Sequence, residues 1–326
     1  MNKRKLDLGI DVGSVSVKIV LIERPHSVID KSYTRHYGEP FLVLKKKLES
    51  LFRIYPVQNI GLRSFTGTGG KLASELLGGF FVNEVIAQSE AVIALYPYVR
   101  TVIEMGGEDS KLLTFEKSKH ASAPVINDFT MNTMCSAGTG SFLDQQATRL
   151  GVCIEKEFGK MALESSAPPQ IAGRCSVFAK SDMIHLQQIG TPVIDIVAGL
   201  CFALARSFKS SLIMGKNIKK PILFQGGVAA NKGLVKAFET LLDLKDGELI
   251  VPEHSTCMGA IGAVLSSRRS QKKSKTSNSF SGFTNLDRYL DKANNDFVTT
   301  LPLSHEDNGH IADTTTREIG AGKKEE

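Results

Sequence analysis

The chain has 326 residues, of which 42% are hydrophobic and 23% charged, values ordinary for a globular protein with two domains or one bilobal unit. The net charge of +6 is spread thinly, without a long basic stripe interleaved with aromatic residues, so nucleic-acid binding is not expected. No apolar run approaches the roughly 20 residues that span a bilayer, and the basic residues 1–5 precede too short an apolar stretch for a signal peptide. We therefore expect a cytoplasmic protein without a membrane segment.

Strands and helices are expected in the following order. Two hairpins are predicted from apolar, β-branched runs that flank small-residue turns, at residues 6–22 and 101–115. Further strands are expected at 59–66 and 221–224. Helical periodicity of the apolar residues marks 71–77, 141–150, 176–188, 193–214 and 231–242.

The composition changes from about Ser266 onward. Basic residues there stand among Ser, Gln and Thr with almost no aliphatic residues, a pattern typical of a flexible, solvated linker. Residues 280–303 have some apolar periodicity and are a candidate docking helix, and we expect the last twenty or so residues to be disordered.

The two predicted hairpins share one pattern of residues. In residues 11–18 and again in 104–111, an acid ends a strand, a small-residue turn follows, and a lysine begins the returning strand. Glycine lets backbone N–H groups approach a phosphate without a side chain in the way, and an acid at a strand end can hold Mg²⁺ through its water shell. One such turn is commonplace, but two in register predict a grip on one triphosphate from both sides.

A third element adds to this nucleotide hypothesis. Residues 221–231 read as a strand, the Gly226-Gly227 turn and a helix that starts near Asn231. Backbone at such a turn can lie flat against a base or ribose, and a helix N-terminus favours phosphate. Alone this is consistent with a plain β–α turn; beside two phosphate hairpins we interpret it as the adenosine site.

The order of elements over about residues 6–265 resembles the actin, sugar-kinase and heat-shock ATPase superfamily. The resemblance implies an α/β fold of two ribonuclease-H-like lobes with ATP in the cleft. The first lobe is expected at 1–97 plus about 258–265, the second at 98–257, and a basic, flexible tail at 266–326. Asp11 and Asp109 are expected to coordinate Mg²⁺, and Glu104 to position the attacking water. The nucleotide-binding residues expected are Gly13, Ser14, Val15, Ser16, Lys18, Gly106, Gly107, Gly226, Gly227 and Asn231.

The five cysteines are an odd number at irregular spacing, and in a reducing compartment they are expected to be core residues, metal ligands or redox groups. Cys135 and Cys175 each lie just ahead of a predicted helix start, where unpaired N–H groups and the helix dipole stabilise a metal-ligating thiolate. A 4Fe–4S cluster usually takes four cysteines, which a two-fold dimer would supply. Reactive or merely buried thiols are the alternative. Cys153, Cys201 and Cys257 lack this context, and Cys201 is expected in the core.

Five stretches of the chain resemble the activator family of 2-hydroxyacyl-CoA dehydratases, which is related to the ATPase subunits of benzoyl-CoA reductases. Cys-Ser-Ala-Gly-Thr-Gly, followed later by Arg-Cys-Ser-Val-Phe-Ala, is highly specific to that family. The resemblance implies a homodimer with one bridging 4Fe–4S cluster and a nucleotide in each subunit, and it makes Cys135 and Cys175 the cluster ligands. The matching stretches are 11–18, 104–109, 132–143, 174–180 and 224–231.

Residues 141–146 and 180–188 look like a divergent branch of that family, close to long fusion proteins and to reductases of double-cubane cluster proteins. The chain also continues for about sixty residues past the point where the simplest activators stop. The implied electron acceptor is a 2-hydroxyacyl-CoA dehydratase or a double-cubane-type iron–sulfur reductase, and the implied donor a ferredoxin or flavodoxin.

Two other functions are compatible with the same ATPase core. A sugar or carboxylate kinase would need an acceptor pocket with a base, and the sequence has no specific sugar-binding motif that stands out. An ATP-switched interaction module without metal is the second alternative. Iron content and colour of anaerobic protein separate all three functions.

Overall fold

The computed structural model describes residues 6–117, 124–132, 138–271 and 280–296. The chain divides into two compact units, Met1–Phe283 and Thr284–Glu326, and the first unit holds both β-sheets. The described part of the second unit is one helix, α10 (Thr284–Asp296).

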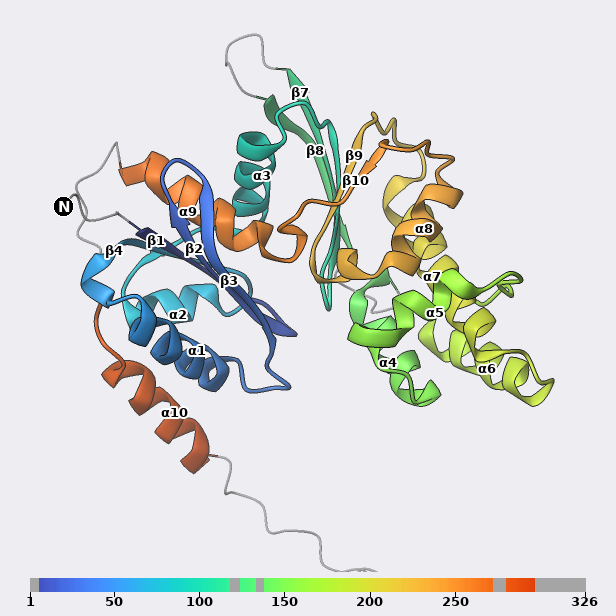
Figure 1. Ribbon diagram of the computed structural model, residues 1–326, viewed down its shortest axis with the longest axis horizontal. Helices are drawn as coiled ribbons and strands as arrows, with labels where there is room; N and C mark the ends of the chain where they lie inside the picture. The colour runs from blue at the N-terminus through green and yellow to red at the C-terminus, as the bar shows by residue number, and fades with distance from the viewer. Residues whose placement is uncertain (1–5, 118–123, 133–137, 272–279, 297–326) are drawn as a thin grey trace, which may run out of the picture. The chain divides into compact units, whose positions relative to one another are not determined.

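The first sheet has the strand order β3-β2-β1-β4-β5 (Figure 1). Its first three strands in sequence form an antiparallel meander, and the next two run parallel to β1. The buried, β-branched residues of β1 and β2 explain why they lie at the centre. The strands are β1 (Leu6–Val12), β2 (Ser16–Glu23), β3 (Ser27–Arg35), β4 (Ile60–Thr66) and β5 (Phe80–Phe81).

The second sheet repeats this topology, with the order β10-β9-β6-β7-β8. Again three strands form an antiparallel meander, and two more run parallel to the first of them. Two copies of this arrangement are two ribonuclease-H-like lobes, so the predicted fold class is confirmed. The strands are β6 (Thr101–Met105), β7 (Ser110–Lys117), β8 (Pro124–Asn132), β9 (Ile222–Gln225) and β10 (Leu249–Ile250).

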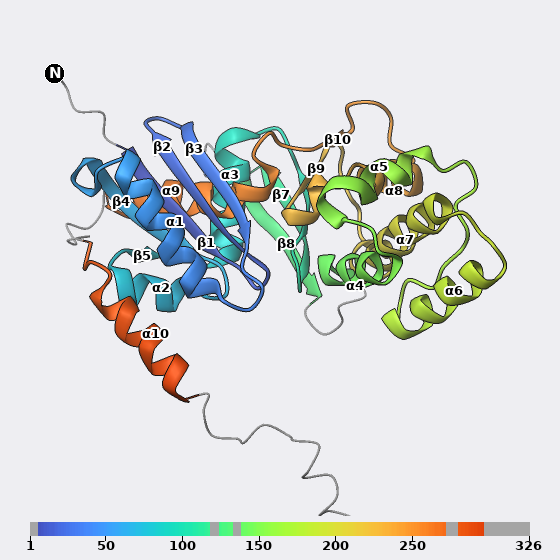
Figure 2. The same cartoon turned by 60° about the horizontal axis from the view of Figure 1, so that its bottom comes forward.

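Helices α3 (Glu84–Leu95) and α9 (Met258–Gln271) form a central layer that belongs to both lobes. They pack against each other, and α9 also packs on β1, β2 and β4. One hydrophobic core joins side chains from β2, α3, α9, β6 and β7, so the two helices lie between the two sheets (Figures 1 and 2). A movement of one lobe relative to the other would therefore change the packing of this layer. Helices α1 (Pro40–Ile54) and α2 (Gly70–Leu77) pack on the first sheet.

The other face of the second sheet is covered by helices. Their core includes Phe208, Phe224 and Phe238, whose rings make edge-to-face contacts with centroids 5.5 and 5.1 Å apart. The helices are α4 (Gly140–Leu150), α5 (Gly159–Glu164), α6 (Ser176–Gln188), α7 (Val193–Phe208) and α8 (Lys232–Leu241). Short π-helical turns lie at Ile154–Phe158 and Lys209–Ile213, and 3₁₀ turns at Val57–Asn59, Gly227–Ala230 and Ser255–Cys257.

The helix predicted at 193–214 is present, as Val193–Ile213, but it contradicts the expectation that no apolar run approaches the length of a membrane span. It is a 21-residue helix, apolar and long enough to cross a membrane by length and composition, the one such helix in the described residues. Of the most apolar 18-residue stretch of this helix, 72% is buried inside the protein. Its side chains pack in the core of the second lobe, which accounts for their hydropathy.

The end of the first unit also differs from the expected linker. Helix α9 continues past Ser266 to Gln271, and Arg268 Nε lies 2.7 Å from the buried Asp7 carboxylate. Farther on, the rings of Phe280 and Phe283 pack on Phe52 of α1, with centroids 5.3 and 6.1 Å away. The residues just after 266 therefore contribute an ion pair and apolar contacts to the first unit. Part of residues 280–303 is helical, as α10.

Candidate functional site

A cleft of about 510 Å³ opens between the two hairpins, β1–β2 (the first hairpin) and β6–β7 (the second hairpin). All thirteen residues that the sequence assigns to nucleotide, magnesium or water line this central cleft. The topology brings them together, because both hairpins begin at the central strand of their sheet. They are Asp11, Gly13, Ser14, Val15, Ser16, Lys18, Glu104, Gly106, Gly107, Asp109, Gly226, Gly227 and Asn231.

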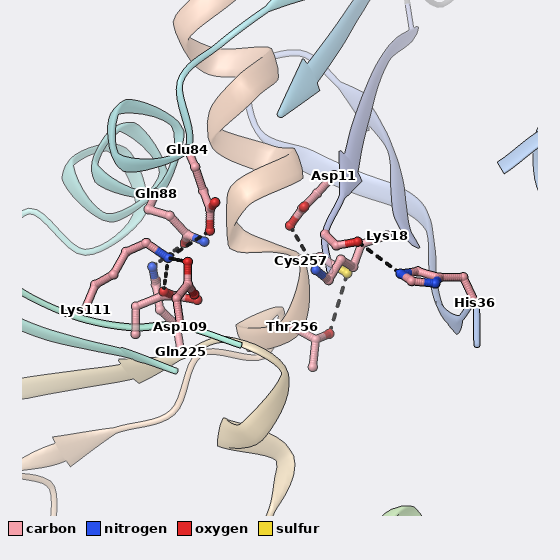
Figure 3. Close-up of polar contacts among 12 residues, drawn as sticks. Asp11, Lys18, His36, Glu84, Gln88, Asp109, Lys111, Gln225, Thr256 and Cys257 are labelled. Carbon is pink, nitrogen blue, oxygen red and sulfur yellow. Dashed lines mark hydrogen bonds and ion pairs between the residues drawn. The ribbon is translucent and has the colours of Figure 1, made fainter. Parts of the chain in front are cut away.

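The sequence repeat is also a repeat of backbone geometry. In the first hairpin the Gly13 N–H donates to the Ser16 carbonyl at 3.0 Å, and in the second the Gly106 N–H donates to the Asp109 carbonyl at 2.9 Å. The acid and the lysine are cross-strand partners in both hairpins. Figure 3 shows the two clusters, with Asp11 and Lys18 in one and Asp109 and Lys111 in the other. Two equivalent turns thus present their backbone to the same cleft.

The tips of the two hairpins touch. A Cβ atom added at Gly107 would lie 2.2 Å from Val15 Cγ2 and 3.5 Å from Ser14 Oγ. In the first hairpin, a Cβ at Gly13 would lie 2.7 Å from Lys18 Nζ. At Gly107 the close approach of Val15 favours glycine, whereas at Gly13 the flexible end of the Lys18 side chain could move aside.

Carboxylates of the second hairpin and of α3 gather around one lysine. Lys111 Nζ lies 2.9 Å from Glu104 Oε2, 2.8 Å from Asp109 Oδ2 and 3.0 Å from Glu84 Oε1. In the first hairpin the corresponding Lys18 Nζ lies 3.3 Å from Asp11 Oδ2. Each hairpin therefore carries a lysine paired with an acid; Lys111 is buried and Lys18 is half-buried.

Burial and charge act in opposite directions on these groups. Burial raises the pKa of Glu104 to about 7, although Lys111 beside it lowers that pKa. Burial also raises the pKa of Glu84, which lies near the carboxylates of both Asp11 and Asp109. For Lys111 burial lowers the pKa, but the surrounding carboxylates outweigh burial and keep the ammonium charged. Carboxylate oxygens therefore gather around Lys111, and they are of the ligand type that Mg²⁺ prefers.

The predicted adenosine element forms the opposite wall. Gly226 has φ of +97°, and a Cβ there would lie 2.2 Å from the Met105 carbonyl oxygen, so the turn passes flat over the end of β6. Asn231 caps helix α8, its Oδ1 accepting from the Leu234 N–H at 3.2 Å. Its buried Nδ2 has no hydrogen-bond partner in the described part of the chain. This amide is a donor that a ligand oxygen could satisfy.

Helix α4 begins on the second hairpin. The N–H groups of Gly140 and Ser141 donate to the carbonyls of Gly106 and Gly107, at 2.9 and 2.8 Å. Ser110 Oγ donates to the Gly138 carbonyl at 2.9 Å. The first turn of α4 follows the Cys135 segment in sequence. It is therefore hydrogen-bonded directly to the Gly106-Gly107 turn of the second hairpin.

The cysteines differ in environment. Cys135 lies outside the described residues, whereas Cys175 is partly exposed and is the N-cap residue of α6, as the sequence predicts. Contrary to the sequence expectation, Cys153 also precedes a helical turn, and its thiol lies 3.6 Å from the Glu155 carboxylate. Cys201 is buried in the core, as expected, and burial raises its pKa to about 12. Cys257 is buried as well.

Several cleft residues were not predicted from the sequence. Glu84 and Gln88 come from α3, and Arg35 comes from the end of β3. Asn83 caps α3 by accepting from the Val85 N–H at 3.0 Å, so an Asn-Glu pair ahead of an apolar helix was the available signal. Nothing local to the sequence marks Arg35, because its partners lie more than a hundred residues away.

Comparison with known proteins agrees with this geometry. The 2-hydroxyisocaproyl-CoA dehydratase activator of Clostridioides difficile is 29% identical over 272 residues, 82% of this chain and 98% of that relative. The (R)-2-hydroxyglutaryl-CoA dehydratase activating ATPase of Acidaminococcus fermentans is 29% identical over 262 residues, 79% of this chain and 95% of the relative. The solved activator of the 2-hydroxyisocaproyl-CoA dehydratase from Clostridium difficile with bound ADPNP superposes with a TM-score of 0.72 at 27% identity, covering 84% of this chain and 100% of that one.

The resemblance seen in the sequence motifs is thereby confirmed. The family model of the BadF/BadG/BcrA/BcrD ATPases matches residues 8–267, which include nearly all of both hairpins, the whole of α3 and the Gly226-Gly227 turn. With a cleft between two equivalent hairpins and a sequence match over most of its length, this chain belongs to the BadF/BadG/BcrA/BcrD ATPase family.

Proposed function

We propose that this chain is an ATP-dependent activator, which hydrolyses ATP and thereby drives single-electron transfer to a partner iron–sulfur enzyme. The electron would come from a 4Fe–4S cluster shared by two copies of the chain. The names of the relatives support a 2-hydroxyacyl-CoA dehydratase as the acceptor, and a double-cubane-type reductase is the other acceptor expected from the sequence. A ferredoxin or flavodoxin would supply the electron, and the cytoplasm is the expected compartment.

In the central cleft the hairpins would hold the triphosphate from both sides. Asp11 and Asp109 are carboxylates at the cleft, the donor type that Mg²⁺ prefers, and a bound magnesium ion would neutralise phosphate charge. Glu104 would orient the attacking water, and Lys18 would balance phosphate charge. Gly226, Gly227 and Asn231 would receive the adenosine. Hydrolysis of this kind depends on positioning and electrostatics and needs no covalent nucleophile.

The residues near Cys175 fit a shared cluster. Cys175 is the N-cap residue of α6 and is partly exposed, so its thiol can be reached by a ligand or by a second copy of the chain. Val177 and Phe178, which follow Cys175 closely in α6, are each 66% exposed. Exposed apolar side chains beside a proposed cluster ligand support a second copy of the chain that covers this face. Together with Cys135, Cys175 would give each copy two of the four ligands, and the cluster would supply one-electron redox chemistry.

One observation carries the coupling of the two sites: the hydrogen bonds from the N-terminus of α4 to Gly106 and Gly107. A γ-phosphate bound at that turn contacts the same backbone that anchors α4. Because α4 follows the Cys135 segment, a shift of the turn displaces the helix beside a proposed cluster ligand. The γ-phosphate would thus change the structure around the thiols if it binds one position of the turn more tightly than the other.

The test uses anaerobically purified, full-length protein. We expect it to be brown and to contain about four iron and four sulfide per dimer. Dithionite-reduced protein should reduce a partner dehydratase only with hydrolysable ATP, and a non-hydrolysable analogue should change the EPR signal or chelator access relative to ADP without turnover. Colourless protein after reconstitution, or identical spectra with ADP, analogue and ATP, contradicts the proposal. Phosphorylation of a small sugar or acid would favour a kinase instead.

A further inference from the structure

Lys111 is buried directly behind the wall of the central cleft, a wall to which its three carboxylate partners belong. Its ammonium lies within 3.0 Å of three carboxylates that come from three elements: Glu104 from β6, Glu84 from α3 and Asp109 from the turn before β7. Figure 3 shows Lys111 reaching toward Glu84 and Asp109. In the first hairpin, by contrast, Lys18 forms an ion pair with Asp11 alone among the residues that the structure describes. The repeat of acid and lysine is therefore not symmetric in space.

The same three carboxylates have the geometry of a metal-ligand set. One oxygen from each of Glu84, Glu104 and Asp109 lies within 4.8 Å of the others. Three carboxylate oxygens at this spacing suit a hard divalent cation. The Lys111 ammonium lies among these three carboxylates, so a side chain of the protein takes the place that a metal cation would otherwise occupy.

The three partners of Lys111 differ in exposure. The Lys111 and Glu104 side chains are 2% and 4% exposed, whereas Glu84 and Asp109 are 28% and 29% exposed. Lys111 and Glu104 are also cross-strand partners in β6 and β7. The Lys111–Glu104 pair is thus the fixed part of the cluster, and Glu84 and Asp109 are the carboxylates that an incoming ligand can reach.

We propose that Lys111 is a built-in competitor of the divalent cation, which keeps the nucleotide-free cleft free of metal and makes metal binding conditional on nucleotide. The proposal rests on the proposed ATPase function and adds an order of binding to it. Without nucleotide, Lys111 satisfies all three carboxylates. When nucleotide brings phosphate oxygens, they supply the metal with further ligands, Asp109 turns from Lys111 to the metal–phosphate complex, and Glu104 keeps Lys111 as its partner.

A merely structural lysine would behave differently. Removing a structural counter-ion destabilises the fold because it leaves buried carboxylates unpaired. Removing a competitor has a second effect: the nucleotide-free protein gains affinity for a divalent cation. The gain of binding, and not the loss of stability, is therefore the informative measurement. Lys111 is a positioning residue in this proposal.

The experiment measures Mn²⁺ binding to nucleotide-free, full-length protein through the EPR signal of free Mn²⁺. Lys111→Met should bind one Mn²⁺ per chain at least about tenfold more tightly than the wild type, because a positive charge within 3.0 Å of the ligands is gone. Lys111→Met combined with Glu104→Gln restores the net charge of the cluster and should lose most of this gain. Lys220→Met, which removes a lysine 2.7 Å from Glu248 outside the cleft, is the matched control and should bind Mn²⁺ as the wild type does.

Equal Mn²⁺ affinity in Lys111→Met and wild type would overturn the proposal, and so would a gain that survives in the double variant. If Lys111→Met does not fold, the wild type decides: it should bind Mn²⁺ at least about tenfold more tightly with a non-hydrolysable ATP analogue than without nucleotide. Equal binding in those two states would overturn the proposal as well. A failure of the ATPase function would be visible separately, as absent binding of the analogue itself by calorimetry.

Discussion

Arg35 and Asp144 form an ion pair that joins the first lobe to the second at the central cleft. Arg35 ends strand β3, and Asp144 lies one turn into α4. The Arg35 Nη1 lies 3.1 Å from Asp144 Oδ1 and 3.0 Å from Glu155 Oε1, and Nη2 makes a second contact with Asp144. The pKa of Arg35 is raised, chiefly by its hydrogen bond to Asp144. This bidentate contact links α4 to the first lobe, while backbone bonds link α4 to the second hairpin.

Arg35→Ala should weaken binding of an ATP analogue roughly three- to tenfold, because it removes a contact that holds the cleft closed. Calorimetry measures the affinity. The matched control is Lys236→Ala, which removes a surface pair with Glu239 within α8 and should leave the affinity unchanged. Unchanged affinity in Arg35→Ala would mean that the interlobe pair does not contribute to closure.

Asp11→Asn should lower ATP hydrolysis by about a hundredfold or more, because the site loses the charged partner of Lys18 and a proposed magnesium ligand. Phosphate release under anaerobic conditions measures this rate. Iron and sulfide content should stay at the wild-type value, since the first hairpin supplies no thiol. Turnover at the wild-type rate would show that the metal is bound elsewhere.

Gly107→Ala should separate the hairpin tips, because its methyl group would lie 2.2 Å from Val15 Cγ2. We expect ATP hydrolysis to fall at least about tenfold, with analogue affinity falling in parallel. Adding Val15→Ala removes the clashing methyl groups and should recover much of the loss. If the double variant is no better than the single one, the tip contact is not the cause.

If Cys175 holds the proposed cluster, Cys175→Ala should remove the iron and weaken the proposed dimer, whereas Cys201→Ala should leave the iron content unchanged. In the metal-free protein, iodoacetamide at pH 8 should modify Cys175 and spare Cys201, because burial raises the pKa of Cys201 to about 12 and keeps its thiol neutral. Peptide mass spectrometry locates the label. Rapid labelling of Cys201 in folded protein would contradict the buried position.

A chain that ends at Phe283 should keep its solubility and ATPase activity, because it retains Arg268 and the aromatic contacts with Phe52. A chain that ends at Ser267 should lose about 3 kcal/mol of stability, since Asp7, 1% exposed, loses its closest cation. Arg24, 3.6 Å from Asp7, remains as a weaker partner. Urea unfolding of both chains and of Arg268→Met separates the ion pair from the rest of the segment.

The elements with strong local patterns were predictable. Both hairpins, α6 and the turn at Gly226 follow from β-branched runs, helical periodicity and glycine pairs. Strands β3 and β8 and helix α1 were not predicted: the two strands lie on sheet edges with mostly exposed or half-buried residues, so their hydrophobic pattern is weak.

The sequence by itself determined the two acid–turn–lysine hairpins, because their pattern is contained in eight consecutive residues each and needs only a local turn. Tertiary structure alone decided which groups meet them. Glu84 reaches Lys111 because α3 packs between the sheets, and Arg35 reaches Asp144 across 109 residues of chain. Such pairs depend on how two separate lobes close on one core, and no local propensity carries that information.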